Sequence, residues 1–206
     1  MIVKVCGLRD THNIRAVEEQ AAPDWYGFIF YARSPRYVAD VPTYLPRGGR
    51  RVGVFVKPDT DDVLHRARQF GLHTVQLYGA PPAQCAALRE AGLQVIVALS
   101  ATGDLDALAT PYIYNTDYFL FDTPTASYGG SGRQFDHTLL ATYTGSVPFL
   151  LSGGLGPASL PAVRAVAHPR FAGIDLNSGF ETAPARKDAA LLADFIKSVR
   201  DGALND

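Results

Sequence analysis

The first residues that could do chemistry are Lys4 and Cys6, which alternate with apolar residues at the start of the chain. Residues two apart in a strand point to the same side, at about 3.3 Å of rise per residue, so the two groups lie roughly 6 to 7 Å apart. A nearby positive charge favours the thiolate, which is the reactive form of cysteine. The stretch therefore predicts an activated thiol at the end of a buried strand, with a cysteine packed in the core as the alternative.

A carboxylate follows another apolar strand further along the chain. Asp122 comes directly after Phe119-Leu120-Phe121. Apolar neighbours and a second carboxylate at Asp175 would both raise its pKa toward that of a general acid. The alternative is an aspartate that caps a helix or forms a salt bridge. An acid at Asp122 and a base at Cys6, on opposite sides of a bound sugar phosphate, would describe a proton-transferring isomerase.

Further polar groups end other apolar stretches and could bind an anion. Gly153-Gly154 and Asn177-Ser178-Gly179 can present backbone amides where two loops meet, although either loop alone could hold ordinary turn glycines. Arg36 could bind a second anionic group through a bidentate contact, or form a surface salt bridge instead. Gln76 ends a fourth apolar strand. The five histidines lack ligand spacing, so no metal site is expected.

Alternating strands and helices must position these groups. Apolar stretches of strand length occupy residues 2–6, 25–30, 51–56, 74–79, 94–99, 118–122, 148–152 and 171–176. Helical patterns occupy residues 12–21, 41–45, 59–70, 82–91, 136–143, 158–167 and 188–199, with only helical fragments over 103–110. Such alternation, without a break in composition, predicts parallel strands joined by crossovers.

Eight such units predict an α/β fold, a single (β/α)8 TIM barrel over residues 1–206 with eight parallel strands and a thin helical layer around strand five. An open, doubly wound sheet is the alternative, which the count of eight disfavours. The active site of a (β/α)8 barrel lies at the carboxyl ends of its strands. The polar residues that end the apolar strands are therefore predicted to meet at one mouth.

Composition narrows the classes of partner. The chain has 206 residues, 19 basic and 20 acidic, with a formal net charge of -1. This balance indicates neither nucleic acid nor an anionic membrane surface as a partner. Two cysteines, a first strand that begins at residue 2, and apolar runs far below the roughly 20 residues needed to span a bilayer predict a soluble, cytoplasmic protein.

Several short motifs occur in one order along the whole chain. They are Lys4-Val5-Cys6-Gly7-Leu8, Gly27-Phe28-Ile29-Phe30, Ser34-Pro35-Arg36-Tyr37, Val52-Gly53-Val54-Phe55-Val56, Val75-Gln76-Leu77, Leu120-Phe121-Asp122, Gly129-Gly130-Ser131-Gly132 with Phe135-Asp136, Leu151-Ser152-Gly153-Gly154-Leu155, Ile174-Asp175 through Gly179 to Glu181, and Lys187-Asp188. In their order and spacing, the chain resembles the phosphoribosylanthranilate isomerase family of tryptophan biosynthesis.

The resemblance implies an Amadori rearrangement of N-(5'-phosphoribosyl)anthranilate to 1-(2-carboxyphenylamino)-1-deoxyribulose 5-phosphate. It implies a small phosphorylated substrate, no cofactor, no metal, and a monomer or homodimer. Asp122 would be the general acid that protonates the ring oxygen, and Cys6 the base that removes the C2 proton. The substrate-binding groups it implies are Arg36 for the anthranilate carboxylate, Asp175 for the sugar, Gln76, and the backbone around Gly153, Gly154, Ser178 and Gly179 for the phosphate.

Three residues depart from the family pattern, although none of them is the implied acid or base. Tyr78 stands where histidine is usual, Val97 replaces a common lysine, and Ala185 replaces the glycine usual before the Lys-Asp pair. Two other functions are compatible with the residues alone. One is a sugar-phosphate-binding barrel without catalysis. The other is a different phosphate-binding barrel enzyme, such as an indole-glycerol-phosphate synthase or a pentose-phosphate epimerase, whose lysine-glutamate set or metal-binding histidines are not found.

Overall fold

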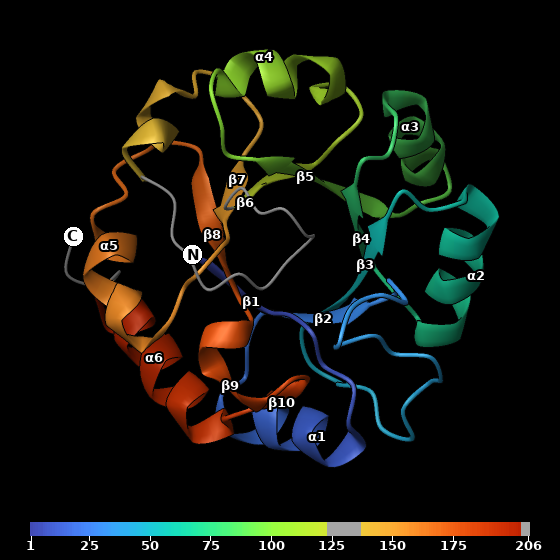
Figure 1. Cartoon of the computed structure of the whole chain (residues 1–206), viewed down its shortest axis with the longest axis vertical. Coiled ribbons are helices and arrows are strands. Elements are labelled where there is room, and N and C mark those ends of the chain that lie inside the picture. The colour runs from blue at the N-terminus through green and yellow to red at the C-terminus, as the bar shows by residue number, and fades with distance from the viewer. Residues whose placement is uncertain (123–136, 203–206) are drawn as a thin grey trace.

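The computed structural model describes residues 1–122 and 137–202, and its main sheet is a closed barrel of eight parallel strands (Figure 1). The strands are β1 (Ile2–Val5), β2 (Trp25–Ile29), β3 (Arg50–Val56), β4 (Thr74–Tyr78), β5 (Gln94–Ser100), β6 (Tyr118–Asp122), β7 (Phe149–Leu151) and β8 (Phe171–Leu176). β8 pairs with β1 and closes the sheet, with Lys4 opposite Asp175. The predicted (β/α)8 barrel is confirmed, and the open sheet is wrong.

Helices surround the barrel in chain order (Figure 1). They are α1 (Thr11–Gln20), α2 (Thr60–Phe70), α3 (Pro82–Glu90), α4 (Leu105–Ala109), α5 (Leu160–Arg164) and α6 (Ala189–Gly202), with 3-10 turns η1 (Thr110–Tyr112), η2 (His137–Thr142), η3 (Pro157–Ser159) and η4 (Ser178–Phe180). Between β5 and β6 the chain forms only α4 and η1, so the predicted thin layer is confirmed. No helix within residues 1–122 and 137–202 has the length and apolar character to cross a bilayer.

Side-chain caps explain where the helices begin. The side chain of Asp10 accepts a hydrogen bond from the amide of Asn13 at 2.9 Å, and Asp59 does the same for Asp61 at 2.9 Å. Each cap satisfies an amide that has no partner within its helix. α2 ends at Gly71, whose φ of 55° is left-handed, as is usual for a glycine after a helix.

Three predicted helices are wrong in type or length. Residues 41–45 form neither helix nor strand. Pro42 and Pro46 lack amide donors, and Glu18 on α1 accepts the amides of Arg47 and Gly48 at 2.7 Å each, which holds the segment against α1 instead.

The other two helices are shorter than predicted. The pattern at 136–143 becomes the 3-10 turn η2, and the pattern at 158–167 becomes η3 followed by the five-residue helix α5. Pro157 is the first residue of η3 and Pro161 the second of α5, within the first turn, where a proline is tolerated but supplies no amide. The chain also forms a hairpin that no sequence pattern predicted, made of β9 (Glu181–Ala183) and β10 (Arg186–Lys187).

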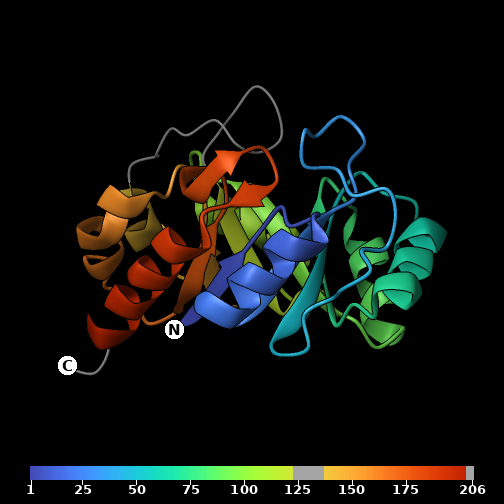
Figure 2. The ribbon, with the colours of Figure 1, turned by 90° about the horizontal axis from the view of Figure 1, so that it is seen from below.

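Side chains inside the barrel include more polar groups toward the carboxyl ends of several strands, as at Asp122 and Asp175. An apolar cluster of buried residues forms the lower layer, made of Trp25, Val52, Ile96, Ala98, Leu120 and Leu150. Because strand residues two apart share a face, Asp122 points to the same side as Leu120, one layer higher. Figure 2 shows that the β9–β10 hairpin and the loop after β2 rise at the same end of the barrel. The apolar layer therefore closes the barrel interior below the end at which the strands finish.

Gly173 allows β8 to approach β1 closely enough to close the barrel. A Cβ added at Gly173 would lie 2.1 Å from the carbonyl oxygen of Ile2, which is backbone and cannot turn away. We expect Gly173→Ala to lower the free energy of unfolding by about 1 to 3 kcal/mol or more through overpacking. In the control Gly48→Ala, the nearest atom is 3.5 Å away, so we expect a change within about 0.5 kcal/mol. Urea unfolding measures both, and equal losses would contradict this account.

Candidate active site

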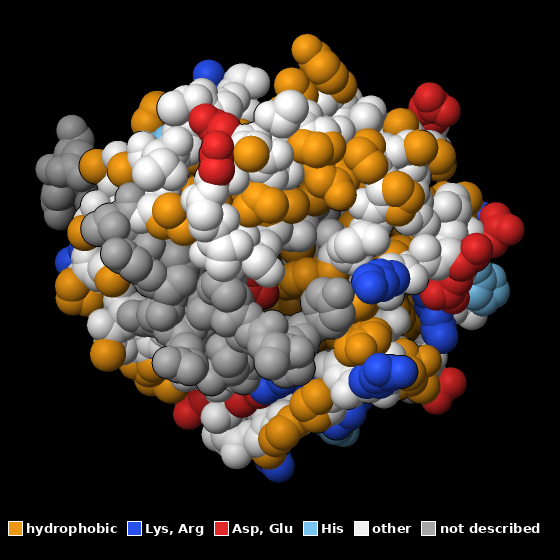
Figure 3. All heavy atoms as spheres, turned by 45° about the horizontal axis from the view of Figure 1, so that its top comes forward, with side chains coloured by type: hydrophobic (Ala, Val, Ile, Leu, Met, Phe, Trp, Pro, Cys, Tyr) orange, Lys and Arg blue, Asp and Glu red, His pale blue; other side chains and the backbone are white. Residues whose placement is uncertain are grey.

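A pocket of about 820 Å³, counted to its open mouth, lies at the carboxyl ends of the strands. Eight of the nine residues given a catalytic or substrate-binding role in the sequence analysis line it, namely Cys6, Arg36, Gln76, Asp122, Gly153, Gly154, Asp175 and Ser178. Figure 3 shows acidic and basic side chains scattered among hydrophobic ones on the face that it views, without a patch of one sign.

Gly179 does not line the pocket but lies behind it. A Cβ at this position would be 2.2 Å from the carbonyl oxygen of Leu155 and 2.9 Å from Cα of Gly156. The missing side chain therefore lets the loop after β8 pack against the loop after β7. Sequence analysis grouped Gly179 with the anion-binding residues, and the structure gives it a visible role in bringing the two loops together.

These two loops present backbone amides at one side of the pocket. Gly153 and Gly154 have φ values of 90° and 67°, which a residue with a Cβ rarely adopts. The amides of Ser178 and Gly179 stand at the start of η4 and donate to no acceptor among the described residues. Amides at such a turn can bind an anion without a charged side chain. The arrangement fits a phosphate group.

Cys6 lies directly after β1, above a buried ion pair. Nζ of Lys4 lies 2.9 Å from Oδ1 of Asp175, and the lysine is fully buried. Burial acts to lower the pKa of Lys4, but the negative charge of Asp175 and the thiol of Cys6 outweigh it, so the pKa is raised. Lys4 is therefore charged and paired.

The net effect on Cys6 is opposite to the sequence-based expectation. Burial raises the pKa of the Cys6 thiol above its ordinary value of 9.0, and the charge of Lys4 offsets only part of this rise. Cys6 is 3% exposed, and Asp175 shares the positive charge of Lys4. Lys4 therefore favours the thiolate, as the sequence indicated, but it does not bring the pKa of Cys6 below the ordinary value.

Asp122 is held by a chain of two hydrogen bonds. The hydroxyl of Tyr78 donates to Oδ2 of Asp122 at 3.1 Å, and the amide nitrogen of Gln76 donates to the same hydroxyl at 3.2 Å. Burial, followed by the negative charge of Asp122, raises the pKa of Tyr78 well above its ordinary value of 10.0, so the phenol stays a donor. The second carboxylate expected beside Asp122, that of Asp175, is compensated by Lys4.

One buried side-chain atom among the described residues makes no hydrogen bond. Oε1 of Gln76 is buried and makes no hydrogen bond with any described residue. A buried acceptor without a donor is costly, and this one belongs to a residue that lines the pocket. We interpret it as an acceptor for a ligand.

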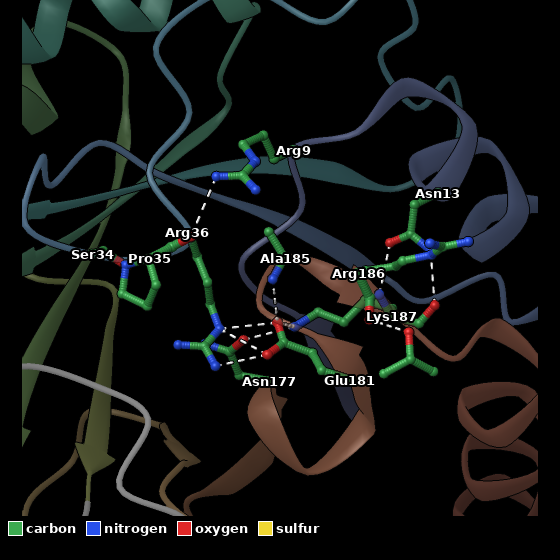
Figure 4. A network of polar contacts seen from close by, with 11 residues as sticks. Arg9, Asn13, Ser34, Pro35, Arg36, Asn177, Glu181, Ala185, Arg186 and Lys187 are labelled. Atoms are coloured by element: carbon green, nitrogen blue, oxygen red, sulfur yellow. Dashed lines mark hydrogen bonds and ion pairs between the residues drawn. The ribbon is translucent and has the colours of Figure 1, made fainter.

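Arg36 forms an ion pair that sequence analysis did not assign. Its Nη2 lies 2.7 Å from Oε2 of Glu181, and Nζ of Lys187 lies 2.7 Å from Oε1 of the same carboxylate (Figure 4). A Cβ at Gly7 would lie 2.7 Å from Cδ of Arg36, so this glycine leaves room for the arginine stem. Glu181 and Lys187 belonged to the recognised motifs, yet their pairing depends on a hairpin that no local pattern indicates.

The three departures from the family pattern lie in different surroundings. Tyr78 lines the pocket and contacts Asp122. Val97 is buried in the hydrophobic core and is not part of the pocket wall. Ala185 has a φ of 64° in the β9–β10 turn, a conformation that favours glycine.

Part of the predicted site lies outside the described residues. This part is the motif stretch Gly129-Gly130-Ser131-Gly132 with Phe135-Asp136. Within residues 1–122 and 137–202, His, Cys, Asp and Glu side chains form no group of three or more that could hold a metal ion. The described pocket thus combines a thiol, a carboxylate and an arginine with backbone amides, a set suited to moving protons on an anionic sugar derivative.

Comparison with known proteins agrees with this chemistry. The family model described as N-(5'-phosphoribosyl)anthranilate (PRA) isomerase matches residues 3–198. A protein of Phocaeicola vulgatus named N-(5'-phosphoribosyl)anthranilate isomerase is 50% identical over 202 residues, which cover 97% of this chain and 98% of that protein.

Two solved structures have the same fold at similar length. A phosphoribosyl anthranilate isomerase in complex with reduced 1-(o-carboxyphenylamino)-1-deoxyribulose 5-phosphate aligns with a TM-score of 0.80 at 28% identity, over 98% of this chain and 100% of that chain. Monomers generated from the dimeric phosphoribosylanthranilate isomerase of Thermotoga maritima align with a TM-score of 0.80 at 30% identity, again over 98% and 100% of the two chains.

The buried pair of Lys4 and Asp175 gives a stability test. Lys4→Met leaves the Asp175 carboxylate buried without its partner, so we expect a loss of about 3 to 5 kcal/mol in the free energy of unfolding. Adding Asp175→Asn removes the unpaired charge, and the double variant should recover most of that loss. Urea unfolding at pH 7 measures the three proteins. A double variant no more stable than Lys4→Met would contradict the pairing.

Proposed function

The chain belongs to the N-(5'-phosphoribosyl)anthranilate isomerase family, and from this premise we propose that Asp122 and Cys6 are the general acid and general base of its reaction. The enzyme converts N-(5'-phosphoribosyl)anthranilate to 1-(2-carboxyphenylamino)-1-deoxyribulose 5-phosphate in tryptophan biosynthesis. Family membership decides against a different phosphate-binding barrel enzyme. The observation that supports the two assignments is that the thiol and the carboxylate line one pocket, after β1 and at the end of β6.

In the proposed mechanism the acid acts first. Asp122 donates a proton to the furanose ring oxygen while the anilino nitrogen lone pair displaces the C1–O bond, which opens the sugar to a protonated Schiff base. Cys6 then removes the proton from C2, and the electron pair of the C–H bond moves to form an enolamine. The enolamine gains a proton at C1 and loses one from the C2 hydroxyl, which gives the ketone.

The remaining groups bind the substrate. We assign the anthranilate carboxylate to Arg36, through charge-assisted hydrogen bonds, and the phosphate to the backbone around Gly153, Gly154, Ser178 and Gly179. Oε1 of Gln76 accepts a hydrogen bond from the substrate, since it lacks one in the pocket. Oδ1 of Asp175 is bonded to Lys4, so only its Oδ2 is assigned to the sugar.

Two further features of the protein are proposed from its relatives and its thiols. The Thermotoga maritima relative is described both as a dimer and as monomers generated from it, and we propose the same two states, monomer or homodimer, for this chain. Both cysteines are free thiols, and a base at Cys6 must remain one. A reducing compartment ensures this, so we propose a cytoplasmic enzyme.

The catalytic assignments predict the effect of removing either group. Cys6→Ala and Asp122→Asn are each expected to lower kcat by about 10²- to 10⁴-fold, which is the contribution of one general acid or base. The assay follows the loss of the intrinsic fluorescence of the anthranilate adduct. Cys85→Ala is the matched control, because Cys85 is buried in α3 away from the pocket and should leave kcat unchanged. Parental turnover in the Cys6 or Asp122 variant would refute that assignment.

The raised pKa of Cys6 predicts a pH profile. The base must be a thiolate, and a pKa above 9.0 keeps most of the free enzyme in the thiol form at neutral pH. Cys6→Asp supplies a base that is already ionised at neutral pH, and both enzymes keep the same proposed acid. We therefore expect kcat/KM of the parent, divided by kcat/KM of Cys6→Asp, to rise with pH by up to about tenfold per unit below the pKa of Cys6. A ratio that stays constant between pH 7 and 9 would contradict the assignment.

A further inference from the structure

Glu181, on the β9–β10 hairpin, occupies one edge of the Arg36 guanidinium group. Nε of Arg36 donates to Oε1 and Oε2 at 2.9 and 3.0 Å, and Nη2 donates to Oε2 at 2.7 Å (Figure 4). The two side chains are 11% and 5% exposed. This two-point contact sets the plane of the guanidinium group as well as its place.

The contact leaves a defined edge of Arg36 for a ligand. A guanidinium group has five N–H donors, of which Glu181 takes the one on Nε and one on Nη2. The edge formed by Nη1 and Nη2 keeps a parallel pair of N–H groups, and Nη1 points away from Glu181 in Figure 4. Arg36 lines the pocket. A planar carboxylate fits such a pair in a bidentate manner.

Glu181 is itself held from two other directions. Nζ of Lys187 lies 2.7 Å from Oε1 of Glu181 and donates to Oδ1 of Asn177 at 2.7 Å. The amide of Ala185 also donates to Oε1, at 3.1 Å. Burial acts to raise the pKa of Glu181, but the hydrogen bonds and charges of Arg36 and Lys187 lower it below its ordinary value. Glu181 is therefore an ionised and immobilised acceptor.

The hairpin that carries Glu181 is fastened to the barrel by α1. Oδ1 of Asn13 accepts the amide of Lys187, and Nδ2 of Asn13 donates to the carbonyl of Lys187, both at 2.8 Å. The side chain of Asn13 thus acts as one more strand partner for β10 (Figure 4). The position of Glu181 is set by the fold and needs no ligand.

The net charge of Arg36, Lys187 and Glu181 favours the binding of one anion. Arg36 and Lys187 carry two positive charges and Glu181 one negative charge, so the group has one positive charge in excess. A bound carboxylate would neutralise it. Without Lys187, the negative charge of Glu181 would cancel that of Arg36, and a second carboxylate would enter an already neutral group.

We propose that Glu181 is a positioning residue for the aromatic carboxylate of the substrate, acting through Arg36, with Lys187 supplying the compensating charge. The inference rests on the proposed role of Arg36 in binding that carboxylate. It goes beyond that role because it explains how Arg36 is aimed, and why a carboxylate beside it strengthens carboxylate binding rather than weakening it. A charge-only view makes the opposite expectation, that removing Glu181 improves binding.

The test compares two ligands that differ only in the carboxylate. The probes are reduced 1-(2-carboxyphenylamino)-1-deoxyribulose 5-phosphate and the same compound with an unsubstituted phenyl ring, and Kd is measured by calorimetry. For Glu181→Gln we expect the carboxylated probe to bind at least about tenfold more weakly, whereas the phenyl probe changes by less than about twofold. In catalysis, KM should rise by more than kcat falls. Glu19→Gln, at an exposed position on α1, is the control and should change neither Kd.

Arg36→Met completes the experiment by separating the two proposals. If Glu181 acts through Arg36, then adding Glu181→Gln to Arg36→Met causes no further loss for the carboxylated probe. Tighter binding, unchanged binding, or an equal loss for both probes in Glu181→Gln would overturn the positioning role. An Arg36→Met variant that keeps its preference for the carboxylated probe would overturn the assignment of Arg36 instead, and the inference with it. Should Glu181→Gln fail to fold, Glu181→Asp keeps the charge and should show the same selective loss, smaller in size.

Discussion

The ion pair between Lys4 and Asp175 is the interaction on which the rest of the site depends. It lies inside the barrel at the seam where the first and last strands meet, and the two residues are direct partners in the register of β1 and β8. Two buried charges hold such a register firmly, since a slip would leave both without a partner. The strands β1 and β8 continue from this ion pair to two residues that line the pocket. Cys6 lies two residues beyond Lys4, and Asn177 lies two residues beyond Asp175.

The seam also explains how the pocket handles charge. Both buried lysines are neutralised by carboxylates, Lys4 by Asp175 and Lys187 by Glu181, so neither is left to attract the phosphate. We assign that task to backbone amides, which carry no net charge and need no counterion. Arg36 then provides the one positive charge in excess. A pocket built in this way can distinguish the two anionic ends of its substrate by the kind of donor each end meets.

Strand positions, and the meeting of the proposed acid and base at one pocket, could be predicted from sequence because they follow from short-range patterns and the barrel topology. Alternation places Lys4 and Cys6 on one face, and the barrel rule brings Cys6 and Asp122 to one mouth. The pairing of Arg36 with Glu181 spans 145 residues and that of Asn13 with Lys187 spans 174. No local pattern encodes contacts of this kind. The raised pKa of Cys6 could not be predicted from sequence either, because it depends first on the burial of the thiol in the folded protein.

The surroundings of acid and base differ in a way that orders the proposed steps. Asp122 receives a hydrogen bond from Tyr78, which stays protonated. Cys6 is buried, and its thiol form is favoured, so the proposed base acts through the smaller thiolate fraction. In the proposed mechanism, ring opening by Asp122 places a positive charge on the Schiff base nitrogen beside C1. That charge makes the C2 proton acidic, so the base can act only after the acid has acted.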